Sequence, residues 1–487
     1  MKFSALTAAL RQKKFDFSVS NPGGLDPLVS HVFVDSRRVT PGSIFCCIRG
    51  EKYDGHDYIP VAAEAGAGAL VCESPVETEL PAILVKSTRE IMGELAAEVY
   101  GRPAEKLLMA GVTGTNGKTT TTYVLRSILQ AAGIRTGLLG TVVESDGVHE
   151  RDAERTTPES CDIQRLLASM VKNGCGACVM ETSSHGLMIG RLYGCSFDVC
   201  ILTNLNPEHL DFHKNMENYF QAKRLLFTRY AKKKAVLAVN GDDAWGARLM
   251  KEFPEARGFR FSDVSDLKLD REHSSFTVQM KGFAPLRLES PLIGKFNVFN
   301  VLSAVTALRG EVEDEAIVRG LKEMPQVPGR LEKHGMSNGA TCIIDFAHTP
   351  EALRNVLSAV RDFSPHRVIS IFGHGGGRYE SNRPELGKIA ASLADLIIVT
   401  MDNPRNEDPA AIAESIVEGI LEQGGGTRYR VILDRKEAIL TGLSIAGSGD
   451  VLVVSGKGPE KFLTIRGERI PFNDAETVEE WERLARG

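Results

Sequence analysis

The sequence lacks the features that would place this chain in a membrane, on a nucleic acid or outside the cell. No apolar run is close to the length of about 20 residues that is needed to span a bilayer. The N-terminus offers one lysine but no long apolar segment, so we expect no signal peptide. Neither sign of charge dominates, since 58 Lys and Arg face 63 Asp and Glu for a net charge of −5. This balance disfavours nucleic-acid and membrane partners, and we expect a cytoplasmic protein.

The nine cysteines of this chain of 487 residues do not have the character of a disulfide framework. Many of the nine lie inside apolar runs, which indicates reduced thiols in the core. Cys175 and Cys178 have the spacing of a metal or redox pair, but no second pair follows at the spacing of a zinc ribbon. We therefore interpret them as core thiols as well.

A glycine-rich segment, GTNGKTT at 114–120, follows an apolar strand and precedes a helical pattern. Backbone N–H groups of such a loop can surround phosphate oxygens, and the start of the helix adds partial positive charge. Lys118 would reach the β- and γ-phosphates and the Thr119 hydroxyl would bind Mg²⁺. The match to the usual phosphate-loop pattern is imperfect because Val112 stands where its first glycine would be. An ordinary glycine-rich turn is the alternative, but we predict ATP or GTP binding by Gly114, Thr115, Asn116, Gly117, Lys118, Thr119 and Thr120.

The chain is too long for one hydrophobic core and divides into three predicted domains, 1–103, 104–332 and 333–487. In the first, we expect strands at 31–34, 43–48 and 82–85 and a helix near 60–65. In the second, we expect strands at 106–111, 177–180, 198–203 and 234–239. In the third, we expect strands at 341–345, 367–372, 395–400, 428–433 and 450–455, with helices such as 352–363 and 409–421 between them. The predicted fold class is α/β, with a central P-loop ATPase-like parallel sheet and a C-terminal Rossmann-like doubly wound domain.

Glu181 and His209 follow predicted strands, where a nucleotide site would need a metal ligand. Glu181 ends a predicted strand and could face the nucleotide, or it could be a solvated loop carboxylate. His209 follows the next strand and lies four residues before His213, a spacing that zinc ligands can have, although Pro207 and the polar run indicate a loop with solvated histidines. Lys223 lies on an amphipathic helix, where the pattern alone predicts an exposed lysine.

Taken together, these strings resemble the Mur ligases of peptidoglycan synthesis over nearly the whole chain. Five motifs in order carry the resemblance: the D-S-R, P-G and D-G-H elements at 35–56, GTNGKTT at 114–120, TTP at 156–158, ETSSHG at 181–186 and the loop 203–213. The family plan has three domains that bind, in chain order, the UDP-substrate, ATP and the amino acid. The resemblance implies a ligase that activates a carboxylate as an acyl phosphate and joins it to an amine. The motifs fit best the member that adds the third residue of the stem peptide.

The resemblance also assigns roles to single residues. It implies that Lys118 and Thr119 hold ATP phosphates and Mg²⁺, that Glu181 and His209 are further Mg²⁺ ligands, and that Lys223 is carbamylated to become another. Contacts to the UDP-N-acetylmuramoyl dipeptide are implied for Ser36, Thr156, Thr157, Ser183 and Arg191. Contacts on the ATP side are implied for Asn297, Asn300, Arg330, Asp345 and His348.

The amino acid that is added is predicted from the D-N-P-R string at 402–405, which follows a strand of the third domain. The string resembles that of members that accept meso-diaminopimelate, whose distal carboxylate a guanidinium could hold with two parallel hydrogen bonds. The predicted pocket comprises Arg378, Asp402, Asn403, Pro404, Arg405, Gly456 and Glu460. The alternatives are the same ligase with L-lysine, a ligase like folylpolyglutamate synthetase, and a regulatory P-loop ATPase. We expect the enzyme to act as a monomer.

Overall fold

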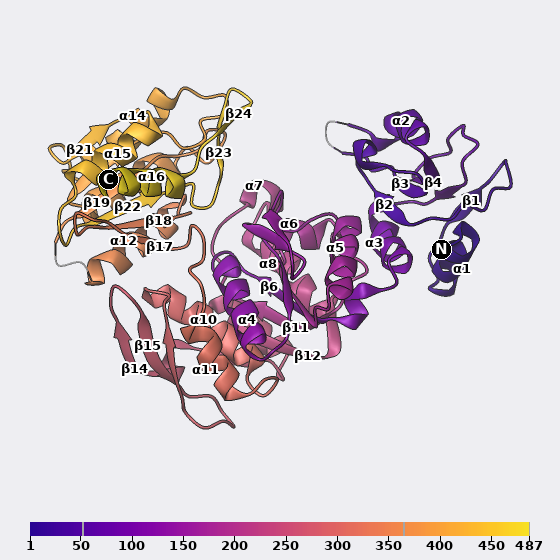
Figure 1. Ribbon diagram of the computed structural model, residues 1–487, viewed down its shortest axis with the longest axis horizontal. Coiled ribbons are helices and arrows are strands. Elements are labelled where there is room, and N and C mark those ends of the chain that lie inside the picture. Colours follow the sequence, from indigo (N-terminus) through magenta and orange to yellow (C-terminus); the bar gives the residue numbers. More distant parts are fainter. Residues whose placement is uncertain (51–52, 364–365, 487) are drawn as a thin grey trace. The chain divides into compact units, whose positions relative to one another are not determined.

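The computed structural model describes residues 1–50, 53–363 and 366–486, and the chain forms two compact units (Figure 1). The first unit comprises Met1–Phe261 and Asn300–Gly320, and the second comprises Ser262–Phe299 and Leu321–Gly487. Each unit has its own sheets and its own apolar core, so each is described by itself.

The first unit begins with a five-stranded sheet. Its strand order is β1 (Ser18–Ser20), β5 (Ala82–Leu84), β4 (Ala67–Cys72), β3 (Ser43–Cys46) and β2 (His31–Phe33). Only β1 runs antiparallel to its neighbour. The accompanying helices are α1 (Phe3–Gln12), α2 (Ile59–Glu64) and α3 (Thr88–Val99). Strands β3 and β4 are almost wholly buried, as expected where helices cover both faces of parallel strands.

The same unit continues into an eight-stranded sheet. The strand order is β13 (Arg257–Phe259), β12 (Ala231–Asn240), β11 (Phe197–Leu202), β6 (Leu108–Thr113), β10 (Ala177–Glu181), β7 (Thr136–Leu139), β8 (Val143–Ser145) and β9 (Glu150–Asp152). The strands from β13 to β7 are parallel, whereas β8 and β9 form an antiparallel extension. The carboxyl ends of β6, β10 and β11 lie side by side, which is the edge where parallel α/β sheets bind ligands.

Helices connect the strands of this second sheet (Figure 1). They are α4 (Lys118–Ala131), α5 (Ser160–Lys172), α6 (Ser184–Met188), α7 (Leu210–His213), α8 (Met216–Thr228) and α9 (Ala244–Glu252). Two more helices, α10 (Lys295–Leu308) and α11 (Asp314–Lys322), come after the last strand of the sheet. Local sequence explains several of their starts. The Asp243 side chain accepts hydrogen bonds from Trp245 N and Gly246 N, and so caps α9.

The second unit contains a small antiparallel sheet, β14 (Val264–Leu269), β15 (Ser274–Val278) and β16 (Leu286–Ser290), and a larger one. The larger sheet has the order β17 (Glu332–Gly335), β18 (Thr341–Asp345), β22 (Val451–Ser455), β19 (Val368–Phe372), β20 (Leu396–Val399) and β21 (Tyr429–Val431), of which only β17 is antiparallel. The helices of this unit are α12 (Pro350–Phe363), α13 (Asn382–Leu393), α14 (Pro409–Glu422), α15 (Arg435–Ile445) and α16 (Asp474–Arg486), and β23 (Phe462–Ile465) pairs with β24 (Glu468–Pro471).

The predicted α/β class is confirmed, and the expected strands of the third domain lie within about a residue or two of β18 to β22. The strand expected at 106–111 begins later, because residues up to Lys106 form a 3₁₀ turn, and it continues through Thr113, which pairs with Leu202. Strand β4 was missed. Among the described residues, no helix combines the length and the apolarity that crossing a bilayer requires. All nine cysteines are unpaired and buried, as expected.

Candidate functional site

The loop between β6 and α4 has the geometry of a phosphate-binding turn. Gly114 and Gly117 have φ of +149° and +86°, a region that favours glycine. A Cβ on Gly114 would lie 1.8 Å from Thr203 Oγ1, so no larger residue fits there. The Lys118 ammonium donates to the carbonyls of Gly114 and Thr115 at 3.0 and 2.8 Å and therefore lies inside the loop. Such a loop, followed at once by the start of a helix, suits a polyphosphate.

A buried carboxylate faces this loop. Glu181 ends β10 and is 1% exposed, so the interpretation as a solvated loop residue is wrong. One of its oxygens accepts hydrogen bonds from Thr119 Oγ1 at 2.9 Å and from Thr141 N at 2.8 Å. The other oxygen accepts from Thr141 Oγ1 at 3.0 Å. The structure thus places a carboxylate and a hydroxyl, both hard oxygen donors, beside the phosphate loop.

The exposed-lysine interpretation of Lys223 is also wrong. This residue of α8 is 2% exposed, and its ammonium donates to the Gly114 carbonyl at 2.8 Å. It lies 4.5 Å from the ring centroid of Tyr219, one helical turn earlier on the same face. Burial lowers the pKa of Lys223 well below that of an exposed lysine, and the nearby charge of Lys118 lowers it further. A second amine therefore bonds the loop at the Gly114 carbonyl, and burial biases it towards its neutral form.

The two histidines of the segment differ in burial, since His213 is buried whereas the His209 side chain is 44% exposed. His209 has a left-handed backbone (φ 56°) and immediately precedes α7. A non-glycine residue in this conformation is strained, and such strain concentrates at functional sites. Partial burial lowers the pKa of His209, and burial lowers that of His213 to about 4. His213 Nε2 lies 3.0 Å from Ser184 Oγ, so His213 is a buried structural contact and only His209 remains a candidate ligand.

The predicted UDP-substrate residues of the central sheet form one hydrogen-bonded group next to Glu181. The Thr157 hydroxyl donates to the Glu181 carbonyl at 2.9 Å and accepts from Ser183 N at 3.0 Å. The Arg191 guanidinium donates to the Thr157 carbonyl at 3.0 Å. Thr156 Oγ1 lies 3.1 Å from Thr141 Oγ1. The group is therefore continuous with the phosphate loop.

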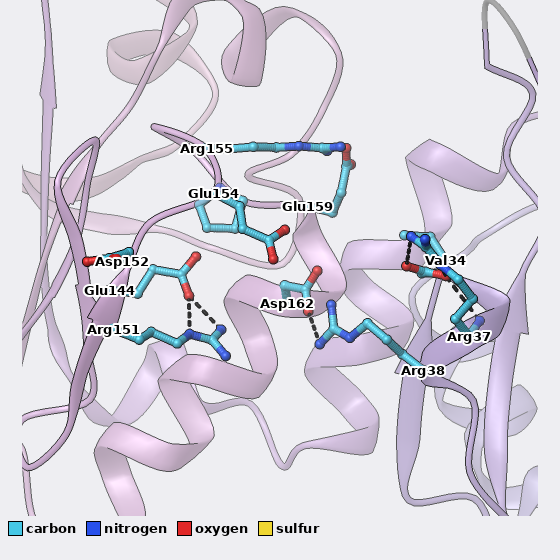
Figure 2. Close-up of a pocket in the computed structure, with 12 residues that line it drawn as sticks. Val34, Arg37, Arg38, Glu144, Arg151, Asp152, Glu154, Arg155, Glu159 and Asp162 are labelled. Carbon is cyan, nitrogen blue, oxygen red and sulfur yellow. Dashed lines mark hydrogen bonds and ion pairs between the residues drawn. The ribbon is translucent and has the colours of Figure 1, made fainter. Parts of the chain in front are cut away.

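A cavity of about 330 Å³ opens beside this group, and charged side chains line it (Figure 2). Figure 2 shows Arg37 and Arg38 on one side and Arg151 and Arg155 on the other, with acidic residues between them. Ser36, the predicted contact, lies in the adjoining 3₁₀ turn but is not among the lining residues.

Glu159 is the most heavily paired carboxylate of this cavity. It accepts from three guanidinium groups: Arg89 at 3.1 Å, Arg155 at 2.6 Å and Arg191 at 3.0 Å. Glu159 thus holds three guanidinium groups together, while the cavity as a whole is lined by more carboxylates than arginines.

In the second unit, four predicted ATP-side residues lie near the end of β18. Asp345 accepts from Leu331 N and Ala347 N, both at 2.8 Å, and burial raises its pKa. The Arg330 guanidinium lies 4.8 Å from the Phe346 ring centroid, and His348 Nδ1 lies 3.0 Å from the Phe346 carbonyl. Asn297 lies on α10 and donates to the Ile293 carbonyl at 2.9 Å. The fifth residue, Asn300, belongs to the first unit, where its Oδ1 lies against Gly117.

The predicted amino-acid pocket gathers at the carboxyl ends of β20 and β22. Asn403 Nδ2 donates to Glu460 Oε2 at 2.8 Å, and the buried Lys457 ammonium donates to the same oxygen at 2.8 Å. The Asp402 carboxylate lies against Gly456, where a Cβ would be 3.0 Å from Asp402 Oδ2. Pro404 connects this group to Arg405.

Arg405 has a left-handed backbone (φ 55°), and its guanidinium donates to the Gly376 carbonyl. The Arg405 guanidinium and the Cγ of Arg378 both lie next to Gly375, so the structure brings the side chains of these two predicted residues close together. Glu407, a possible partner for Arg405, instead pairs with Arg383 at 2.6 Å.

Comparison with known proteins agrees with this geometry. The Mur ligase family catalytic domain matches residues 28–100, the Mur ligase middle domain 112–308, and the Mur ligase glutamate ligase domain 329–458. A UDP-N-acetylmuramoyl-L-alanyl-D-glutamate--2,6-diaminopimelate ligase of Clostridium tetani is 40% identical over 96% of this chain and 97% of its own. The chain belongs to the Mur ligase family. It is therefore an ATP-dependent ligase with the three-domain Mur ligase architecture.

Other Mur ligases are similar over comparable lengths. The protein of the same name from Aquifex aeolicus is 40% identical over 93% of each chain. A solved structure with that name superimposes with a TM-score of 0.66 at 29% identity, covering 94% of this chain and 96% of the other.

Sequence reasoning missed several residues of the charged group around Glu159. Arg155 and Glu159 flank the T-T-P motif, and the charged run that precedes the motif was the available signal. Arg89 comes from α3, more than sixty residues earlier, and nothing in its local sequence indicates that it meets Glu159.

Proposed function

We propose that this chain joins meso-diaminopimelate to UDP-N-acetylmuramoyl-L-alanyl-D-glutamate, with conversion of ATP to ADP and phosphate, in peptidoglycan precursor synthesis. The observation that carries the proposal is the identity of 40% over nearly the full length of relatives that bear this name. We propose that the three domains are separated after residues 103 and 332. We also propose that the protein is a monomer in the cytoplasm.

The phosphate loop supports transfer of the γ-phosphoryl group. Lys118 lies inside the loop, where its ammonium can exchange the Gly114 and Thr115 carbonyls for phosphate oxygens. A substrate carboxylate oxygen attacks the γ-phosphorus and the bond to the β-phosphate oxygen breaks, which gives an acyl phosphate and ADP. The amine of the incoming amino acid then attacks the acyl carbon, phosphate leaves and the amine loses a proton.

The residues beside the loop fit Mg²⁺. Thr119 and Glu181 supply a hydroxyl and a carboxylate whose oxygens lie 2.9 Å apart, the hard donors that this ion prefers. We propose that they hold Mg²⁺ together with His209 and Lys223. When bound, Mg²⁺ supplies positive charge that offsets the negative charge between the carboxylate and the γ-phosphate.

An ammonium at Lys223 would repel Mg²⁺, so this role requires carbamylation. Only a neutral amine reacts with CO₂, and burial favours that form by lowering the pKa of Lys223. The amine nitrogen bonds to the carbon of CO₂ and releases a proton. The resulting carbamate is an anionic oxygen ligand, and its remaining N–H can keep the hydrogen bond to the Gly114 carbonyl.

Two groups of residues are proposed to bind the two substrates that the enzyme joins, the UDP-dipeptide and the amino acid. Ser36, Thr156, Thr157, Ser183 and Arg191 are proposed to contact the UDP-substrate, and the hydrogen bonds that join Thr157, Ser183 and Arg191 into one group support a shared role. For the amino acid, Arg378 and Arg405 would hold the distal carboxylate of diaminopimelate. Glu460 would accept hydrogen bonds from the distal ammonium of diaminopimelate. Asn403 and Lys457 both donate to Glu460 Oε2, so Glu460 Oε1 is proposed to face the ligand.

The test is a phosphate-release assay with ATP, Mg²⁺, the UDP-dipeptide and either diaminopimelate or L-lysine, each component omitted in turn. We expect ADP and phosphate only when all are present, and a preference for diaminopimelate. AMP and pyrophosphate as products, or turnover without the UDP-dipeptide, would exclude the proposal. Lys118→Ala should lose turnover while keeping the wild-type circular dichroism spectrum.

A further inference from the structure

Three potential metal ligands meet in the N-terminal sheet, away from the phosphate loop. Cys47 directly follows β3, Cys72 ends β4, and His56 lies in the 3₁₀ turn Gly55–Tyr58. One ligand atom of each lies within 4.8 Å of the other two, and in the described part of the chain no other group of three or more His, Cys, Asp or Glu does so. Neither the phosphate loop nor the proposed ligation chemistry uses these residues.

The backbone forces the three side chains together. Gly55 packs so closely on the end of β3 that an added Cβ would lie 2.7 Å from Ile48 N and 3.0 Å from Cys47 Cα. Gly55 N also donates to the Ile48 carbonyl at 2.9 Å. Because of this close approach, the next residue, His56, lies beside Cys47.

The sulfur positions match those of a tetrahedral site. Two thiolates bound to zinc at about 2.3 Å are roughly 3.8 Å apart. Cys47 Sγ and Cys72 Sγ are 3.9 Å apart, and both residues have no exposed surface. The imidazole nitrogen lies within 4.8 Å of both sulfurs, so it must move by at most about 1 Å to complete the contact.

His56 is oriented as metal-binding histidines usually are. Its Nδ1 lies 2.6 Å from Asp54 Oδ1, which makes Nδ1 the donor and leaves the lone pair on Nε2. That lone pair now accepts the Glu73 N–H at 3.0 Å. A metal would replace this single hydrogen bond.

We propose that Cys47, His56 and Cys72 bind one Zn²⁺ or a similar thiophilic divalent ion. Two sulfurs and an imidazole are a donor set that selects such ions over Mg²⁺. The ion takes two thiolates and a neutral imidazole, the thiol protons leave to solvent, and water fills the fourth position. It would join the ends of β3 and β4 to the turn 54–58.

The test is titration of the full-length protein, reduced with a phosphine and freed of metal with a chelator, with Co²⁺ or Cd²⁺. We expect a thiolate-to-metal charge-transfer band that saturates at one equivalent, and its loss in Cys47→Ala and Cys72→Ala. Cys46→Ala is the matched control, because Cys46 is the adjacent buried thiol and packs in a different part of the core. The control should keep the band. Absence of the band in the wild type, or an unchanged band in both variants, would overturn the proposal.

A measurement on the wild type alone covers variants that fail to fold. X-ray absorption at the zinc edge of the one-equivalent complex should show two sulfur ligands at about 2.3 Å. A shell of only nitrogen and oxygen would place the ion elsewhere and overturn the assignment. A Cys47–Cys72 disulfide in protein purified under reducing conditions would do the same.

Discussion

Replacing Arg405 tests how the enzyme chooses its amino acid. Diaminopimelate differs from lysine by one distal carboxylate, which a guanidinium can hold with two parallel hydrogen bonds. Arg405 is half-buried and gives one N–H to the Gly376 carbonyl, which leaves donors for a carboxylate. Arg405→Ala keeps the Cβ, so the strain of the left-handed backbone is unchanged.

The expected magnitude follows from the lost contact. A hydrogen bond to a charged group contributes about 1.5–3 kcal/mol, so losing this contact should lower kcat/KM for diaminopimelate by roughly 100-fold. The value for L-lysine should change by less than about 3-fold, since lysine has no distal carboxylate. Arg405→Lys should recover little, because an ammonium cannot form the two parallel bonds.

The assay is phosphate release at saturating ATP and UDP-dipeptide, with each amino acid varied. Arg466→Ala is the matched control: Arg466 is exposed, has the same left-handed backbone, and lies close enough for its N–H to bond the Arg405 carbonyl. The control should keep the wild-type discrimination. A wild type that prefers lysine, or an Arg405→Ala variant with unchanged discrimination, would refute the reasoning.

Three further predictions concern buried charges. Lys223→Ala should lower turnover at least about 100-fold with partial rescue by formate or acetate, and full activity without rescue would contradict carbamylation. Glu159→Gln should raise KM for the UDP-dipeptide with little change in kcat, because it loosens Arg191, and steady-state kinetics that show only a kcat effect would argue against this. Asp474→Asn should lower the free energy of unfolding of the second unit by about 3–5 kcal/mol, as measured by urea unfolding. The Asp474 carboxylate accepts hydrogen bonds from the Arg435 guanidinium at 2.7 and 2.8 Å, and the variant leaves that buried guanidinium without its counter-charge. A loss below about 1 kcal/mol would mean that Arg435 is satisfied by the Met401 and Ser455 carbonyls alone.

The sequence by itself determined the class of the fold and the phosphate loop. Apolar runs such as 341–345 can only be buried strands, and helical patterns between them require parallel pairing. Gly114, Gly117 and Lys118 are recognisable because the loop is made by consecutive residues, so its chemistry is local.

Only the tertiary structure decided which polar side chains are buried. Lys223 has the sequence pattern of an exposed helix residue. It is buried because the fold brings it to the Gly114 carbonyl, more than a hundred residues earlier in the chain, which accepts a hydrogen bond from its ammonium. Glu159 meets Arg89 from another sheet's helix, and Cys47 meets Cys72 across neighbouring strands. Desolvation and charge pairing depend on distances in space between residues far apart in the chain, and no local pattern records them.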